Sequence, residues 1–268
     1  MGLLTPHSER VTRLSRMWRR SSSPVLRMGW HHLLFLHWTI EPEVLRPLIP
    51  RELEIDLYQG RAYIGLIPFT MRRVRPRWLP GLPFAPHLYE DFHETNVRTY
   101  VRDKEGNSGV WFFSLDAASL PAVVAARGWF HLPYFWSKMN LAHVRQCSQS
   151  EIEYSIRYQS RRIWPQPRDV GCDISVDVSG ETPHCALAGS LEHFLVERYF
   201  LFSQNERGLF RGRVRHKPYR LQAARVRQWN ENLIVAAGLQ KPDGAPHVLY
   251  SPEARVEAFP VQTIESLE

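Results

Sequence analysis

The chain of 268 residues contains only three cysteines, and no two of them are spaced as C-x-x-C. The sequence therefore predicts neither a disulfide framework nor a structural zinc site, and it fits a reducing compartment. No apolar run approaches the roughly 18 residues that a transmembrane helix needs. We expect a cytoplasmic protein without a transmembrane segment.

Common catalytic and cofactor motifs are also missing. The sequence has no glycine-rich phosphate loop, no G-x-S-x-G, no H-E-x-x-H and no acidic metal cage, so we expect no cofactor and no metal. Lysine is scarce as well, with only four residues: Lys104, Lys138, Lys217 and Lys241. Chemistry that needs a lysine amine therefore has few candidates.

The composition is that of a folded globular protein, with 44% hydrophobic and 12% aromatic residues. The net charge of +7 is concentrated at the start, where residues 1–23 hold five arginines and only one acid. We interpret residues 1–23 as a basic, disordered tail with a helical stretch around 11–19, and residues 24–268 as one domain. A transit peptide or a membrane-surface helix is the alternative for the tail.

Short apolar segments rich in β-branched and aromatic residues follow one another from Trp30 onward. They predict strands at 33–38, 55–57, 62–69, 97–101, 110–115, 152–158, 174–178, 197–202, 209–214 and 247–249. Helices are expected at 41–48, 119–127 and 225–237. This pattern predicts a mainly β protein built as an antiparallel, strongly curved β-barrel with a few short helices.

The densest polar cluster lies in the predicted strand around residues 92–100. Strand alternation places Glu94, Asn96, Arg98 and Tyr100 on one face and Thr95, Val97 and Thr99 on the other. In a sandwich the polar face would point to water. In a curved barrel the same face would line a cavity, where Glu94 and Arg98 could share a ligand.

A second cluster, residues 116–139, combines many aromatics with Arg127 and Lys138. An apolar pocket would lower the pKa of the lysine and make its amine nucleophilic. The alternative is that Arg127 caps the helix before it and that the aromatics belong to the core.

A third cluster is basic, because residues 207–227 hold seven arginines and Lys217 without one acid. The interleaved apolar residues favour a solvated barrel exterior, and we expect no nucleic-acid partner. Association of this segment and the tail with nucleic acid or a membrane surface is a weaker alternative.

The histidines do not predict a metal site. Alternation places His31 and His37 on one strand face, too far apart to ligate one ion. The spacing of His216 and His247 selects no role for either.

Several of these segments together resemble the YqjF-like family, also called domain of unknown function 2071. The segments that carry the resemblance are 33–36, 44–50, 53–56, 94–98 and 132–134. That family resembles in turn the acetoacetate-decarboxylase-like superfamily. The resemblance implies a mainly antiparallel β-barrel with a central cavity.

The decarboxylases of that superfamily use a lysine that forms a Schiff base with a β-keto acid. In this chain the resemblance places Tyr134 and Phe135 at the two lysine positions, His31 at the position of an arginine and Gly65 at that of the first glutamate. Glu94 matches the second of the decarboxylases' two active-site glutamates. Arg127 matches the arginine of their helix-to-loop motif G-R-E, which reads Ala126-Arg127-Gly128 here. Because an aromatic ring cannot form an imine, we expect no decarboxylation by the family's mechanism.

The resulting hypothesis is an internal cavity for a small anionic or carbonyl compound. Glu94 and Tyr134 are the expected acid–base pair, and Arg127, Arg98, His31 and Lys138 the expected binding residues. The first functional hypothesis is a lyase-like enzyme that acts on small oxo or hydroxy acids without the Schiff base, and the second is a ligand-binding or sensor protein that catalyses no reaction. The sequence leaves open whether the chain forms a homo-oligomer.

Overall fold

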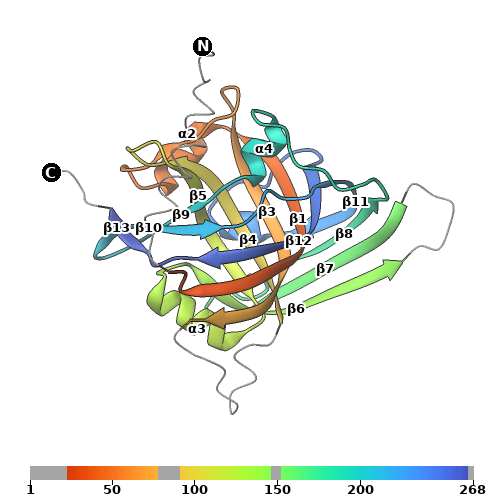
Figure 1. The fold of residues 1–268 in the computed structure, drawn as a ribbon, viewed down its shortest axis with the longest axis horizontal. Helices are drawn as coiled ribbons and strands as arrows, with labels where there is room; N and C mark the ends of the chain where they lie inside the picture. The colour runs from red at the N-terminus through yellow and green to blue at the C-terminus, as the bar shows by residue number, and fades with distance from the viewer. Residues whose placement is uncertain (1–22, 78–90, 146–151, 265–268) are drawn as a thin grey trace.

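The computed structural model describes residues 23–77, 91–145 and 152–264, and most of them lie in strands of one thirteen-stranded sheet (Figure 1). The strands are β1 Leu26–Ile40, β2 Glu54–Ile55, β3 Ala62–Pro76, β4 Phe92–Arg102, β5 Ser108–Ala117, β6 Tyr134–Arg145, β7 Ile152–Trp164, β8 Gly171–Ser179, β9 Phe200–Asn205, β10 Gly208–Arg215, β11 Gln222–Glu231, β12 His247–Ala258 and β13 Gln262–Ile264. The short helices are α2 Pro42–Leu45, α3 Leu120–Trp129, α4 Leu191–Val196 and α5 Leu233–Ala236, and a 3-10 turn covers Arg46–Leu48.

The sheet closes on itself in two ways, because β5 and β12 each pair with three other strands. The wall β12–β1–β3–β4–β5 is common to both closures. One closure runs through β9 and β10 and gives a ring of seven strands; the other runs through β6, β7, β8 and β11 and gives a ring of nine. The predicted curved β-barrel is confirmed, and the described strands pair antiparallel except where β5 meets β6 and β9.

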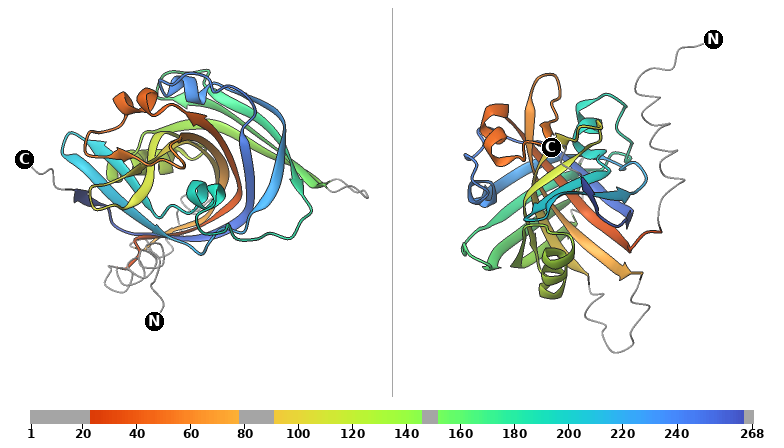
Figure 2. Two further views of the ribbon diagram at one scale, coloured as in Figure 1. Left: turned by 90° about the horizontal axis from the view of Figure 1, so that it is seen from above. Right: turned by 90° about the vertical axis from the view of Figure 1, so that its left-hand side faces the viewer.

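Each face of the common wall is covered by its own apolar cluster. In the seven-stranded ring, Phe35, Ile67 and Tyr100 pack against Leu195 and Val196 of α4, and Figure 2 shows α4 inside that ring. On the other face, Leu36 and Leu66 pack with residues of β7 and β8. Strands β1, β3 and β4 are therefore buried on both sides.

The two helices nearest the wall begin at serine caps. Ser119 accepts a hydrogen bond from the Ala122 N–H at the start of α3, where Pro121 occupies the first turn, and Ser190 accepts one from His193 in α4. Helix α3 places Val123 against Leu115 and Tyr134.

Several expected elements differ from the observed ones. Residues 225–237 form the end of β11 and the single turn of α5 instead of one helix. The aromatic segment after α3 continues as strand β6, which sequence reasoning missed. His31 and His37 do not share a face, because His32 adopts a positive φ of 53° at a bulge in β1. The tail 1–22, its predicted helix and Cys147 lie outside the described residues.

A buried ion pair joins β5 of the common wall to β7 of the nine-stranded ring. The Nε and Nη2 atoms of Arg162 in β7 each donate a hydrogen bond of 2.8 Å to the Asp116 carboxylate in β5. Both side chains are 1% exposed. Asp116 also accepts a hydrogen bond from Ser137, and the Arg162 guanidinium lies 3.5 Å from the centre of the Phe135 ring.

We expect Asp116→Asn to lower the free energy of unfolding by about 3 kcal/mol or more, because it leaves the Arg162 charge buried without a counter-ion. The matched control is Asp91→Asn, whose half-exposed pair with Arg72 is worth less than about 1 kcal/mol. Urea denaturation at pH 7 measures both. Equal, small losses in the two variants would contradict this account of the pair.

Candidate functional site

The predicted polar face of β4 is buried inside the seven-stranded ring. Glu94 is 1% exposed, Asn96 6%, Arg98 8% and Tyr100 0%. The alternative of a polar face turned to water is therefore wrong, because α4 and the aromatic side chains of the ring cover this face. A row of polar groups runs along the strand within an otherwise apolar interior.

Glu94 and Tyr134 meet at the end of this row near α3. The Tyr134 hydroxyl donates to Glu94 Oε2 at 3.1 Å, although the two residues belong to β4 and β6. Burial raises the pKa of Glu94 to about 8, and hydrogen bonds from Tyr134 and Asn96 offset only part of that rise. Burial and the neighbouring carboxylate raise the pKa of Tyr134 well above its usual value. At neutral pH both groups therefore hold their protons.

The Asp116–Arg162 pair lies on the opposite face of the sheet, because Asp116 is opposite Thr95 while Glu94 is opposite Ala117. Its carboxylate contributes to the raised pKa of Glu94 by charge repulsion. Burial also raises the pKa of Asp116, and the hydrogen bonds and charge of Arg162 counteract that effect.

Arg98 lies four residues further along the same face, roughly 13 Å from Glu94 along the strand. Its Nη2 donates a hydrogen bond to the backbone carbonyl of Leu195 in α4, at 3.3 Å. Among the described residues no carboxylate pairs with this guanidinium. Within the part of the chain that the structure describes, the buried Nε of Arg98 and the Oδ1 of Asn96 beside it have no hydrogen-bond partner.

His37 and Tyr100 complete the row and were not predicted as site residues. The Tyr100 hydroxyl donates to the same Leu195 carbonyl at 2.8 Å, so His37 Nε2, 2.5 Å from that hydroxyl, must be the donor to it. Burial and the nearby Arg98 charge hold the pKa of His37 well below its usual value. In the sequence, Gly65 was the one sign of this packing. The residue lies on the neighbouring strand, and a Cβ at this position would lie 3.0 Å from the His37 ring.

The other predicted residues lie elsewhere. Arg127 is exposed; its Nη1 donates to the backbone carbonyl of Tyr134 at 2.7 Å, and its guanidinium faces the Trp164 ring. Lys138 is exposed on β6 opposite Arg161. His31 lies beside Glu253 of β12, with 3.9 Å between Nδ1 and Oε2. The structure thus buries Glu94, Tyr134 and Arg98 in the interior of the seven-stranded ring. Arg127 contacts this group through the backbone carbonyl of Tyr134.

Within residues 23–77, 91–145 and 152–264, no group of three or more His, Cys, Asp or Glu side chains is arranged to hold a metal ion. In the same part of the chain, no helix has both the length and the apolar character needed to cross a bilayer.

Comparison with known proteins gives one clear family match. Residues 27–255 match the DUF2071 family of uncharacterised conserved proteins. The chain is also 33% identical over 238 residues to the uncharacterised protein YqjF of Bacillus subtilis, an alignment that covers 89% of this chain and 92% of that protein.

Three solved structures with a similar fold are enzymes that share little sequence identity with this chain. The enduracididine biosynthesis enzyme MppR complexed with pyruvate has a TM-score of 0.62 at 10% identity, with 90% of this chain and 91% of that one covered. An acetoacetate decarboxylase-like enzyme from Sphingomonas wittichii has a TM-score of 0.60 at 12% identity, covering 92% and 95%. Acetoacetate decarboxylase from Legionella pneumophila has 0.56 at 13%, covering 91% and 88%. These likenesses show the fold.

The raised pKa of Glu94 predicts a pH-dependent stability difference between the wild type and Glu94→Gln. The unfolded chain releases the Glu94 proton near pH 4.5, whereas the folded protein keeps it until about pH 8. Wild-type stability therefore falls as pH rises through this window, by up to about 1.4 kcal/mol per pH unit from this group, and the glutamine variant lacks that fall.

Urea denaturation of both proteins at pH 5, 6, 7 and 8 measures the difference. We expect the stability of Glu94→Gln relative to wild type to increase at each step. A difference that stays constant from pH 5 to pH 8 would show that Glu94 ionises normally.

Proposed function

The chain belongs to the DUF2071 family, and we propose that it binds small oxo or hydroxy acids inside its seven-stranded ring and acts on them by acid–base chemistry without an imine. The proposal requires an internal cavity over Asn96, between Arg98 and the Glu94–Tyr134 pair. It rests mainly on one observation, the burial of Arg98 without a carboxylate.

A buried guanidinium without a counter-ion is costly, and a carboxylate with two oxygens is its natural partner. The Leu195 carbonyl accepts hydrogen bonds from both Arg98 and Tyr100. The carboxylate of a small acid would replace this carbonyl as the acceptor. The free Nε of Arg98 and Oδ1 of Asn96 offer a further donor and acceptor to the rest of the ligand.

Protonated Glu94 supports the acid–base part of the proposal. A carboxylic acid with a pKa of about 8 can donate a proton to a ligand oxygen near neutral pH and take one back in the reverse step. The Tyr134 hydroxyl, 3.1 Å away, would orient this acid and hydrogen-bond to its carboxylate after the transfer.

The absence of an imine follows from the side chains at the lysine positions of the decarboxylases. Tyr134 and Phe135 stand there, and Lys138 is exposed on the outside of β6. MppR, one of the structural neighbours, has been solved with pyruvate. A short 2-oxo acid is therefore a sensible first ligand for this chain as well.

The second candidate is binding without catalysis, as in a sensor. The observation that favours it is the position of α4, whose Leu195 carbonyl occupies the Arg98 site. In this case the acid would bind, but nuclear magnetic resonance spectra of the mixture would show no conversion over time.

We expect Arg98→Gln to weaken binding of pyruvate and 2-oxobutanoate at least 100-fold, because the buried charge-assisted hydrogen bond is lost. Isothermal titration calorimetry measures the affinities. The matched control is Arg225→Gln, which removes an exposed arginine of β11 and should leave them unchanged. If Arg98→Gln binds these acids as wild type does, the site is not in the ring.

Borohydride trapping tests the absence of an imine. After incubation with pyruvate and reduction, we expect no mass increase on any lysine, because no lysine amine lies in the described interior. A stable adduct located on Lys138 by peptide mass spectrometry would contradict this part of the proposal.

A further inference from the structure

Strands β10 and β11 are two parts of one strand whose middle has left the sheet. Arg215 pairs with Glu257 of β12, and Gln222 pairs with Tyr250. Six residues, 216–221, lie between β10 and β11. Six residues of β12, 251–256, lie between the two partner positions. The register is therefore kept across the break, although no pairing forms within it.

The segment 216–221 makes its hydrogen bonds with the chain that leads to and from α4. Leu221 forms a two-bond bridge with His184, and the Tyr219 N–H donates to the Glu197 carboxylate at 2.9 Å. Pro218 and Pro252 have no N–H to donate across the gap. The sheet is therefore interrupted between β12 and residues 216–221, and residues from both sides of this slit line one hollow.

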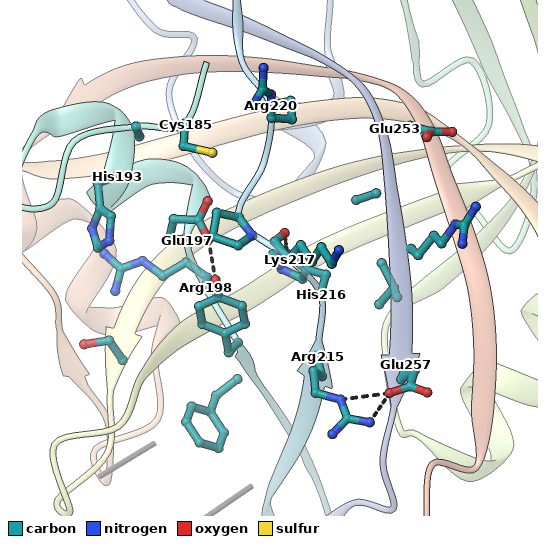
Figure 3. A pocket seen from close by; sticks show the side chains of 18 of the residues that line it. Cys185, His193, Glu197, Arg198, Arg215, His216, Lys217, Arg220, Glu253 and Glu257 are labelled. Atoms are coloured by element: carbon teal, nitrogen blue, oxygen red, sulfur yellow. Dashed lines mark hydrogen bonds and ion pairs between the residues drawn. The ribbon is translucent and has the colours of Figure 1, made fainter. Parts of the chain in front are cut away.

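The slit belongs to a hollow of about 2070 Å³, which is larger than the typical volume of 300–1,000 Å³ for a small-ligand site. In Figure 3, Arg215, His216, Lys217 and Arg220 follow one segment of chain, and Glu253 and Glu257 lie on the neighbouring β12. Glu94 and Arg98 do not line this hollow. It is therefore separate from the site proposed above.

The lining of the hollow is buried on its inner side and exposed at its rim. The inner side carries mainly apolar side chains, Met28, Phe194, Phe200, Ala254 and Val256, together with the buried ion pair of Asp56 and Arg198. Exposed residues of β3, the slit and β12 form the rim, including Arg73, Lys217 and Arg255.

Positive charge predominates around the hollow. Nine lining residues are arginine or lysine and five are acidic, a formal excess of four positive charges. Asp56 is already paired with Arg198, and Glu257 with both Arg27 and Arg215. Among the described residues, no acid pairs with Lys217 or Arg255, which face each other across the slit if the register is continued.

From this arrangement we infer that the hollow is a second binding site, for an amphiphilic anion with a long apolar chain and one anionic head group. The chain of the ligand would pass through the slit onto the apolar inner side. The head group would remain at the rim between Lys217 and Arg255. A short oxo acid lacks the apolar length to use this lining, and a nucleic acid would leave the apolar side uncovered.

Dodecanoate, at concentrations below its micelle threshold, is the probe, and isothermal titration calorimetry on the full chain is the measurement. We expect saturable binding that weakens at least tenfold in the double variant Lys217→Gln/Arg255→Gln and that is tighter than the binding of butanoate. The matched control is Arg168→Gln/Arg225→Gln, which removes two exposed arginines outside the hollow and should bind as wild type does. Dodecanol should bind more weakly than dodecanoate to the wild type and equally to both double variants.

Two results would overturn the inference: no saturable binding of dodecanoate, or equal affinity in the two double variants. Tighter binding of a short oligo-dT than of dodecanoate would also contradict it and would assign the rim to nucleic acid. Arg98→Gln separates the two proposals, because it should keep dodecanoate binding while losing the binding of short oxo acids. Failure at one site therefore leaves the other testable.

Discussion

Residues 94–101 of strand β4 are buried on both faces of the sheet, so their polar side chains have only groups of the protein as partners. Three different outcomes are visible on this strand and on its neighbour β5. Glu94 keeps its proton and binds a tyrosine hydroxyl. On the neighbouring strand, Asp116 stays paired with an arginine that is as deeply buried as itself. Arg98 has only a backbone carbonyl of α4, which leaves one buried cation without an anion.

The two positions at which the resemblance to the decarboxylases expects lysine have clear structural roles here. The Tyr134 hydroxyl donates a hydrogen bond to Glu94, and the Phe135 ring lies against the Arg162 guanidinium. Each aromatic thus supports one buried polar group, on opposite faces of the sheet. An amine in these positions would add positive charge to the interior, whereas the rings stabilise the groups already present without charge.

Sequence reasoning succeeded where the signal was local. Alternation in residues 92–100 placed Glu94 and Arg98 on one face, and the helix predicted at 119–127 corresponds to α3. It failed where distant residues decide the outcome. The bulge at His32 moved His31 away from the face of His37, and β6 forms because its residues pair with β7. No local pattern could show that α4 enters the ring or that Arg127 stays outside it.

The account depends most on Arg98 as the receptor for a small acid. A crystal structure of the protein soaked with 2-oxobutanoate tests this directly. The account predicts a carboxylate within hydrogen-bond distance of the Arg98 guanidinium, with the Leu195 carbonyl displaced from it. Electron density for the acid only at the rim beside β12, with Arg98 still bound to α4, would contradict it.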